Sequence, residues 1–201
     1  GVVSESQSGN YKVGESINLE IPTKEGYTFS HWELVSGVQS ESLNENIFTM
    51  GTSDAEIKAI YTLIEYTIIY NLNGGSVTTN NPITYNRKTE TFALNNPTKT
   101  GYTFTGWSGT GIEGTSMSVT IPKGSAGPRT YTANYVIANY TISYAGLTSE
   151  EISSLGNPTS YNENTAEFTL NNPTREGYTF TGWSGTDIDL KTYTVTYDYQ
   201  D

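Results

Sequence analysis

The chain has 201 residues, no cysteine, and 21 acidic against 10 basic residues, which gives a formal net charge of −11. This charge repels nucleic acid and anionic lipid, and the absence of cysteine excludes disulfides, zinc thiolate sites and thiol nucleophiles. No apolar run approaches the ~20 residues that span a bilayer, and no basic and apolar leader opens the chain, so we expect a soluble segment without membrane insertion or a signal peptide.

Three tryptophans mark a repeat that divides the chain. Trp32, Trp107 and Trp183 follow one another at separations of 75 and 76 residues, a period as long as a small domain. We therefore predict three tandem modules: module one at residues 1–64, module two at residues 65–138 and module three at residues 139–201. Domains of this size bury a limited share of their surface and are individually marginal, so contacts between neighbours matter.

Module one reads as a succession of strands. Ile17, Leu19 and Ile21 alternate with polar residues, which predicts a strand with one buried face. A second strand runs to Trp32 after a Pro-Thr turn. A loop rich in Ser, Asn and Glu follows, and a closing strand is predicted at residues 56–61.

Module two opens with a predicted strand at residues 66–70 and a turn at residues 73–75, since Asn-Gly is a strong hairpin signal. The chain is expected to return through residues 83–94. After the tryptophan segment, Val119 and Ile121 alternate with polar residues and indicate a further strand, before a last one at residues 130–135.

Module three carries a helix signal that the other two modules lack. Thr148 can cap the helix while Glu151 reaches back to the cap, and Leu147 can pack on Ile152. Gly156 can end the helix. We predict a helix of about two turns between the cap and this glycine.

The end of module three is short. Trp107 and Tyr131 are 24 residues apart, whereas the matching Trp183 and Tyr193 are only 10 apart. The strand that holds Val119 and Ile121 in module two is therefore predicted to be missing from module three.

One segment, Pro-Thr-x-x-Gly-Tyr-x-Phe-x-x-Trp, recurs in all three modules and reads as a turn followed by a strand. Its structural residues are Gly26, Tyr27, Phe29, Trp32, Gly101, Tyr102, Phe104, Trp107, Gly177, Tyr178, Phe180 and Trp183. Strict alternation puts the tryptophan on the opposite face from the phenylalanine, and a bulge at Gly106 could bring them together. His31 stands at the glycine position in module one, so a positive φ is not compulsory there, and the facing of the tryptophan stays open.

These residues resemble the Listeria/Bacteroides repeat, the B-repeat family of internalin-like bacterial surface proteins. Modules two and three are the closer matches, and module one resembles the divergent branch. The resemblance implies mostly β (α+β) modules with a β-grasp-like arrangement and one short helix. It also implies an extracellular location at the bacterial cell surface or cell wall.

The chain offers no catalytic constellation. Its only histidine, His31, has no spaced partner for a triad. Asp187 and Asp189, with Glu113 at the matching place in module two, could act in glycoside hydrolysis or hold calcium, but their spacing favours a solvated loop. We expect no catalytic residue, no cofactor and no metal.

The 16 tyrosines allow a groove for a glycan or a peptide, because tyrosine combines an apolar face with a polar tip. Many of them recur at matching strand positions, which favours packing. The leading hypothesis is a non-catalytic spacer or stalk, monomeric, that holds other domains of the same surface protein away from the wall. The alternatives are direct adhesion to a host or matrix protein or glycan, and an accessory domain of a secreted hydrolase.

The junctions between modules predict an elongated, semi-rigid rod. Residues 57–70 and 130–145 contain neither glycine nor proline, whereas flexible linkers are rich in glycine and serine or in charge. We expect adjacent modules to touch, with Leu63, Ile64, Val136 and Ile137 buried at the contacts.

Overall fold

The computed structural model describes residues 8–37 and 43–184, and these form a mostly β structure with one short helix. The strands of module one are β1 (Ser16–Asn18), β2 (Tyr27–Ser36), β3 (Leu43–Asn44), β4 (Ile47–Thr49) and β5 (Glu56–Leu63). Those of module two are β6 (Tyr66–Asn71), β7 (Thr84–Tyr85), β8 (Phe92–Ala93), β9 (Tyr102–Gly109), β10 (Ile112–Ser116), β11 (Thr120–Ile121) and β12 (Arg129–Ile137). Module three contains β13 (Tyr140–Thr141), α1 (Ser149–Leu155) and β14 (Ser160–Tyr161).

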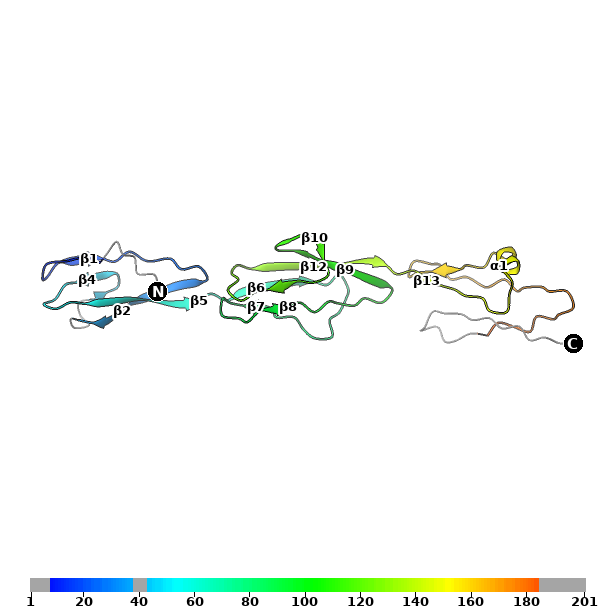
Figure 1. Cartoon of the computed structure of the whole chain (residues 1–201), viewed down its shortest axis with the longest axis horizontal. Coiled ribbons are helices and arrows are strands. Elements are labelled where there is room, and N and C mark those ends of the chain that lie inside the picture. Colours follow the sequence, from blue (N-terminus) through cyan, green and yellow to red (C-terminus); the bar gives the residue numbers. More distant parts are fainter. Residues whose placement is uncertain (1–7, 38–42, 185–201) are drawn as a thin grey trace.

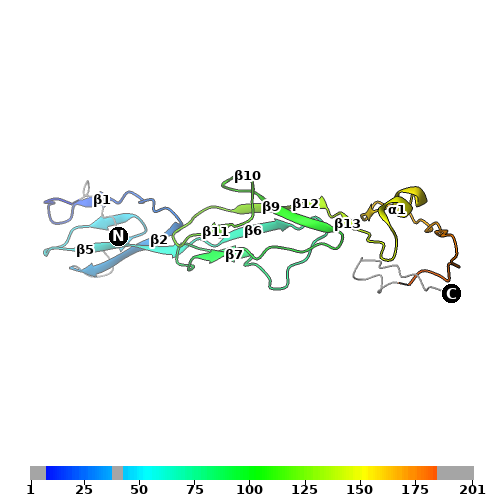
Figure 2. The same cartoon turned by 45° about the vertical axis from the view of Figure 1, so that its right-hand side comes forward.

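The three groups of elements follow one another along the long axis of Figure 1, with β1 and β2 at one end, β9 and β12 in the middle and β13 and α1 at the other end. The same order holds in the turned view of Figure 2. No helix of the described part is long and apolar enough to cross a membrane.

Module one consists of a long antiparallel pair, β2 with β5, and a small sheet of order β1-β4-β3. Leu19 is buried, but Ile21 is 57% exposed, so the predicted buried face from Ile17 to Ile21 is wrong at its end. The reason is that the pairing of β1 with β4 ends at Asn18, and the last bond of this edge joins Leu19 N to Asn46 O. Beyond it, no strand of the described residues pairs with the chain at Ile21.

Module two has a five-stranded mixed sheet of order β10-β9-β12-β6-β7, in which β12 runs parallel to β6 and antiparallel to β9. The predicted turn forms, with positive φ at Asn73 and Gly74. It does not close a tight hairpin, because β7 begins only at Thr84 and the chain after the turn first bonds Thr98. The core of this module gathers around Trp107, which is 0% exposed, with Ile121 and Tyr131.

Module three carries the predicted helix. Thr148 and Glu151 form the reciprocal capping box, and Gly156 ends the helix in the left-handed conformation with φ 65°. Leu147 and Ile152 both pack against the small core of Ile142 and Tyr144.

The motif segment of module three, residues 178–183, is not a strand, which corrects the prediction. A strand needs a hydrogen-bonded neighbour. In module two this neighbour is β12, whose counterpart at residues 192–197 lies outside the described residues.

The junction side chains are less buried than predicted. Leu63, Ile64 and Ile137 are half-buried, but Val136 is 54% exposed and is not a contact residue. Side chains alternate along a strand. Since Ala133 and Tyr135 of β12 face the aromatic core, Val136 faces solvent.

Candidate functional site

The repeated motif builds an aromatic cluster in each module. The rings of Phe104 and Trp107 lie 5.7 Å apart and edge-to-face, and Phe104 also contacts Tyr135 at 5.7 Å. The corresponding Phe29 and Trp32 lie 5.4 Å apart, and Phe180 and Trp183 lie 5.3 Å apart. In every module the tryptophan therefore faces the same way as the phenylalanine, which answers the question that alternation left open.

A bulge makes this possible. In module two the register between β9 and β12 slips between Phe104 and Gly106, and in module one the same slip lies between Phe29 and His31. The extra residue turns the tryptophan back to the core face. The bulge hypothesis is thus confirmed, and it holds with histidine as well as with glycine.

Gly106 is needed for a local reason. Its φ is 130°, and a Cβ there would lie 2.9 Å from the backbone of Ser116 in β10. In the described part of module one no such hairpin follows β2, and His31 is exposed, with Nδ1 3.0 Å from Ser30 Oγ. Glycine is therefore needed here to leave room for β10 in the β9–β10 hairpin. The aromatic cluster itself does not require it.

An asparagine 11 residues before the tryptophan binds its indole. Trp107 Nε1 donates to Asn96 Oδ1 at 3.0 Å, and Trp183 Nε1 donates to Asn172 Oδ1 at 2.9 Å. Module one has Ile21 at this position. Trp32 Nε1 is buried there without a hydrogen-bond partner among the described residues.

In modules two and three, two further asparagines bind each other next to the asparagine that accepts from the indole. Asn81 is buried; its Oδ1 accepts from Asn95 N at 2.7 Å and its Nδ2 donates to Asn95 O at 3.0 Å. Asn157 and Asn171 repeat both bonds at the same lengths. The sequence analysis missed this pair, although the recurring Asn-Pro at residues 81–82 and 157–158 is a visible signal.

The basic residue of the motif ties the turn to the module. Lys24 lies over the ring of Tyr27 and Lys99 over that of Tyr102, both at 4.2 Å, in cation–π contacts. Lys99 Nζ also donates to Asn73 O at 3.0 Å. Most tyrosines of the motif are therefore occupied in packing.

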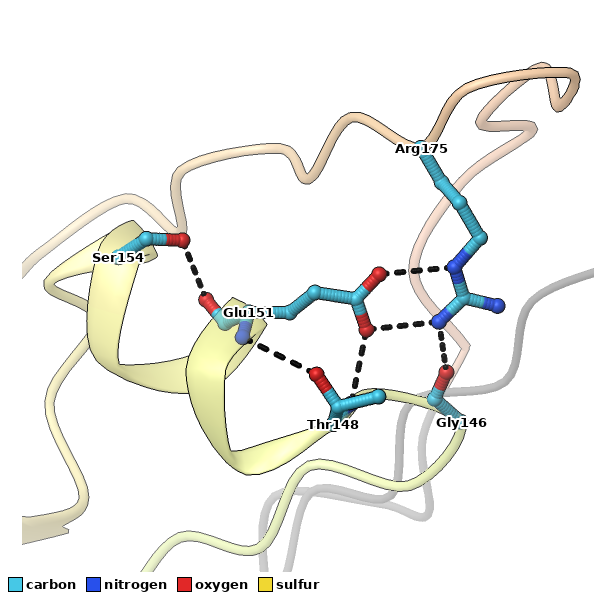
Figure 3. A network of polar contacts seen from close by, with 5 residues as sticks. All are labelled: Gly146, Thr148, Glu151, Ser154 and Arg175. Atoms are coloured by element: carbon cyan, nitrogen blue, oxygen red, sulfur yellow. Dashed lines mark hydrogen bonds and ion pairs between the residues drawn. The ribbon is translucent and has the colours of Figure 1, made fainter.

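In module three an arginine takes this role and binds the helix (Figure 3). Arg175 Nε and Nη2 donate to the two carboxylate oxygens of Glu151 at 2.8 and 2.7 Å, and Nη2 also donates to Gly146 O at 3.0 Å. The hydrogen bonds from Arg175, and then that from the backbone of Thr148, lower the pKa of Glu151 to about 2. The carboxylate stays charged and holds helix and turn together.

Two of the motif glycines, Gly26 and Gly101, lie at the joints between modules. A Cβ at Gly26 would overlap Arg87 of module two, and Arg87 Nη1 lies 2.6 Å from Glu25 Oε2. At the next joint a Cβ at Gly101 would overlap Glu163, the residue that matches Arg87 in module three. At both positions the absence of a side chain leaves room for a residue of the following module.

Two of the residues weighed for catalysis or metal binding, His31 and Glu113, are described, and they lie apart in the chain fold. His31 and Glu113 are exposed in different modules, and Asp187 and Asp189 lie outside the described residues. Within residues 8–37 and 43–184, no group of three acidic, histidine or cysteine side chains is placed to hold a metal ion.

These features define a tandem array of small modules, each with the same aromatic cluster, which lies on a bulged strand in modules one and two. The Listeria-Bacteroides repeat domain matches residues 66–133 and 140–200, and the divergent InlB B-repeat domain matches residues 1–65. The chain belongs to the Listeria-Bacteroides repeat family, with a divergent B-repeat at its start. Neither a curated protein nor a solved structure matched the chain.

Proposed function

We propose that the chain is a non-catalytic, extracellular spacer of a bacterial surface protein: a semi-rigid rod of monomeric, β-grasp-like modules. The mixed sheet of module two, with β12 parallel to β6 at its centre, supports the β-grasp-like arrangement. Membership in the repeat family supports the bacterial surface.

The observation that carries the proposal is the shortness of the links. Only Ile64 and Glu65 separate β5 from β6, and only Ala138 and Asn139 separate β12 from β13. Links of two residues leave little freedom for modules to turn against each other.

Each link is also hydrogen-bonded on both sides. Toward the preceding module, Ile64 N donates to Gly26 O at 3.0 Å and Ala138 N to Gly101 O at 2.9 Å. Toward the following module, Asn86 Nδ2 donates to Glu65, and Asn162 Nδ2 to Asn139 Oδ1 at 2.8 Å. The asparagines at this equivalent position of modules two and three thus bind the link in the same way at both joints.

Small-angle scattering on the intact chain tests the rod. We expect an elongated particle with one well-defined maximum dimension. A matched variant with Gly-Ser-Gly-Ser inserted after Glu65 should broaden the distribution of dimensions, because it frees the first joint alone. A wild-type profile that fits only independently tumbling modules, and that the insertion leaves unchanged, would contradict the proposal.

Adhesion remains the second candidate, and one groove favours it. A polar groove of about 490 Å³ runs beside β10 and is lined by hydroxyl side chains, Glu113 and Arg129. Hydroxyls and an arginine suit a glycan or a polar matrix peptide. Binding of the chain to a panel of such ligands, lost in the exposed-residue variant Thr115→Lys, would support adhesion over a purely mechanical role.

A further inference from the structure

Module three contains an open apolar groove. The corresponding place in module two is filled by residues of module two itself. The open groove has a volume of about 320 Å³, and the described residues that line it are Ile142, Tyr161, Thr165, Ala166, Glu167, Phe168 and Leu170. We name these residues the acceptor groove. Their counterparts in module two, Ile68, Tyr85, Phe92 and Leu94 among them, belong to one closed core.

Strand β11 fills the counterpart in module two. It pairs antiparallel with β8, Thr120 opposite Ala93 and Ile121 opposite Phe92, and Leu94 N donates to Val119 O at 2.9 Å. Val119 and Ile121 are 7% and 1% exposed. One short strand thus supplies both the backbone partner and the apolar cover of this site.

Module three lacks this strand in its sequence, since its stretch from tryptophan to tyrosine is 10 residues long and not 24. In the described part of the chain, residues 168–170 belong to no strand, whereas the matching Phe92 and Ala93 form β8. Phe168 is 39% exposed, and Leu170 is half-buried where Leu94 is buried. Within the part of module three that the structure describes, the acceptor groove therefore combines an apolar floor with a segment that pairs with no strand.

We propose that the acceptor groove binds an extended strand donated by a different protein, with β-branched residues two apart. This is β-strand addition, in which backbone bonds supply affinity and alternate side chains supply specificity. The proposal is independent of the spacer function. A second copy of this chain is a poor donor, because its own Ile121 is buried in its own core.

The residue that follows the strand meets different groups in the two modules. In module two, Lys123 follows β11: its N donates to Thr91 Oγ1 at 3.0 Å and its Nζ lies 2.5 Å from Glu90 Oε1. In the acceptor groove Ala166 and Glu167 stand at the places of Glu90 and Thr91. Module three therefore lacks the carboxylate that pairs with Lys123 Nζ, and Glu167 stands where Thr91 accepts a bond from the backbone N of Lys123.

The test uses the intact chain and a synthetic peptide, Ser-Met-Ser-Val-Thr-Ile-Pro-Lys-Gly, with blocked ends. We expect saturable binding, slower hydrogen exchange at the amide of Leu170, and a higher melting temperature for module three. Phe168→Ser should raise the Kd at least about tenfold. It removes no buried side chain from the free module, because Phe168 is 39% exposed. A peptide with serine in place of both valine and isoleucine should not bind.

Three results would overturn the proposal. One is the absence of saturable binding. Another is equal binding of the serine peptide or of the Phe168→Ser variant. The third is a Leu170 amide that is already protected in the free chain, since the groove would then be filled by the chain itself, or by a second copy if protection depends on protein concentration.

Discussion

The tryptophans of modules one and two lie in equivalent aromatic clusters, but their indole nitrogens differ in hydrogen bonding. Trp107 is 0% exposed and bonds Asn96, whereas Trp32 is half-buried and its nitrogen has no partner among the described residues. A buried donor without a partner costs free energy. The comparison shows that the cluster forms in module one without this hydrogen bond, and we expect the asparagine to add stability in module two.

The tryptophans themselves should give the largest effect. Trp107→Ala removes a completely buried ring and should cost ~3 to 5 kcal/mol, enough to unfold so small a module. Trp32→Ala should cost less because the ring is only half-buried. Thermal unfolding followed through the indole NMR signals of the remaining tryptophans measures both.

A different result would change the role of the residue. If Trp107→Ala left the melting of module two unchanged and abolished binding of a ligand, the tryptophan would be a binding platform and not a packing residue.

The bulge position offers the next test. Gly106→His puts into module two the residue that module one carries, at a φ of 130° and against the Ser116 backbone. We expect a loss of about 1–3 kcal/mol from the backbone strain, with the steric contact adding to it. The reverse change, His31→Gly, should stay within about 1 kcal/mol, because His31 is exposed. Equal losses in both modules would show that the hairpin is not the cause.

The features that could be predicted from the sequence depend on residues that are close together in the chain. The capping box of Thr148 and Glu151 acts over one turn, and the aromatic strand over seven residues, so both could be predicted from local pattern. The Trp107–Asn96 bond could not, because it needs the chain to fold back through the Pro-Thr turn. Val136 was mistaken for a contact because an apolar residue at a junction does not reveal which side of β12 it faces.

Exchanging one residue should exchange the two tryptophan environments. Asn96→Ile leaves the buried Trp107 nitrogen unpaired and should cost about 1–3 kcal/mol. Ile21→Asn should stabilise module one by about 0.5–1.5 kcal/mol, because it supplies the missing acceptor and removes little apolar burial from a residue that is 57% exposed. Denaturant unfolding of each variant gives both values.

The exchange has its own control. Asn96 also donates to Met117 O at 3.0 Å, so Asn96→Asp, which keeps an acceptor for the indole but loses this donor, separates the two bonds. If Ile21→Asn destabilised module one, the unpaired nitrogen would not be the difference that matters between the two modules.

The smallest effect contrasts module three with module two in acid. Arg175 binds a carboxylate, whereas Lys99 binds the carbonyl of Asn73, which does not titrate. Because the pKa of Glu151 is lowered from its ordinary 4.5 to about 2, its ionised form stabilises the folded state. This contribution is present above pH 4.5 and is lost as the pH falls from there toward 2.

Compared with Glu151→Gln, the wild-type module three should therefore melt higher at neutral pH, and the melting temperatures of the two proteins should converge between pH 4.5 and 2. The indole signals of Trp183 and Trp107 follow the two modules in one sample, and the Trp107 signal should not distinguish the variants at any pH. Equal melting of wild type and variant at every pH would mean that Arg175 holds the turn through its other bond, to Gly146 O, and that the charge of Glu151 contributes nothing.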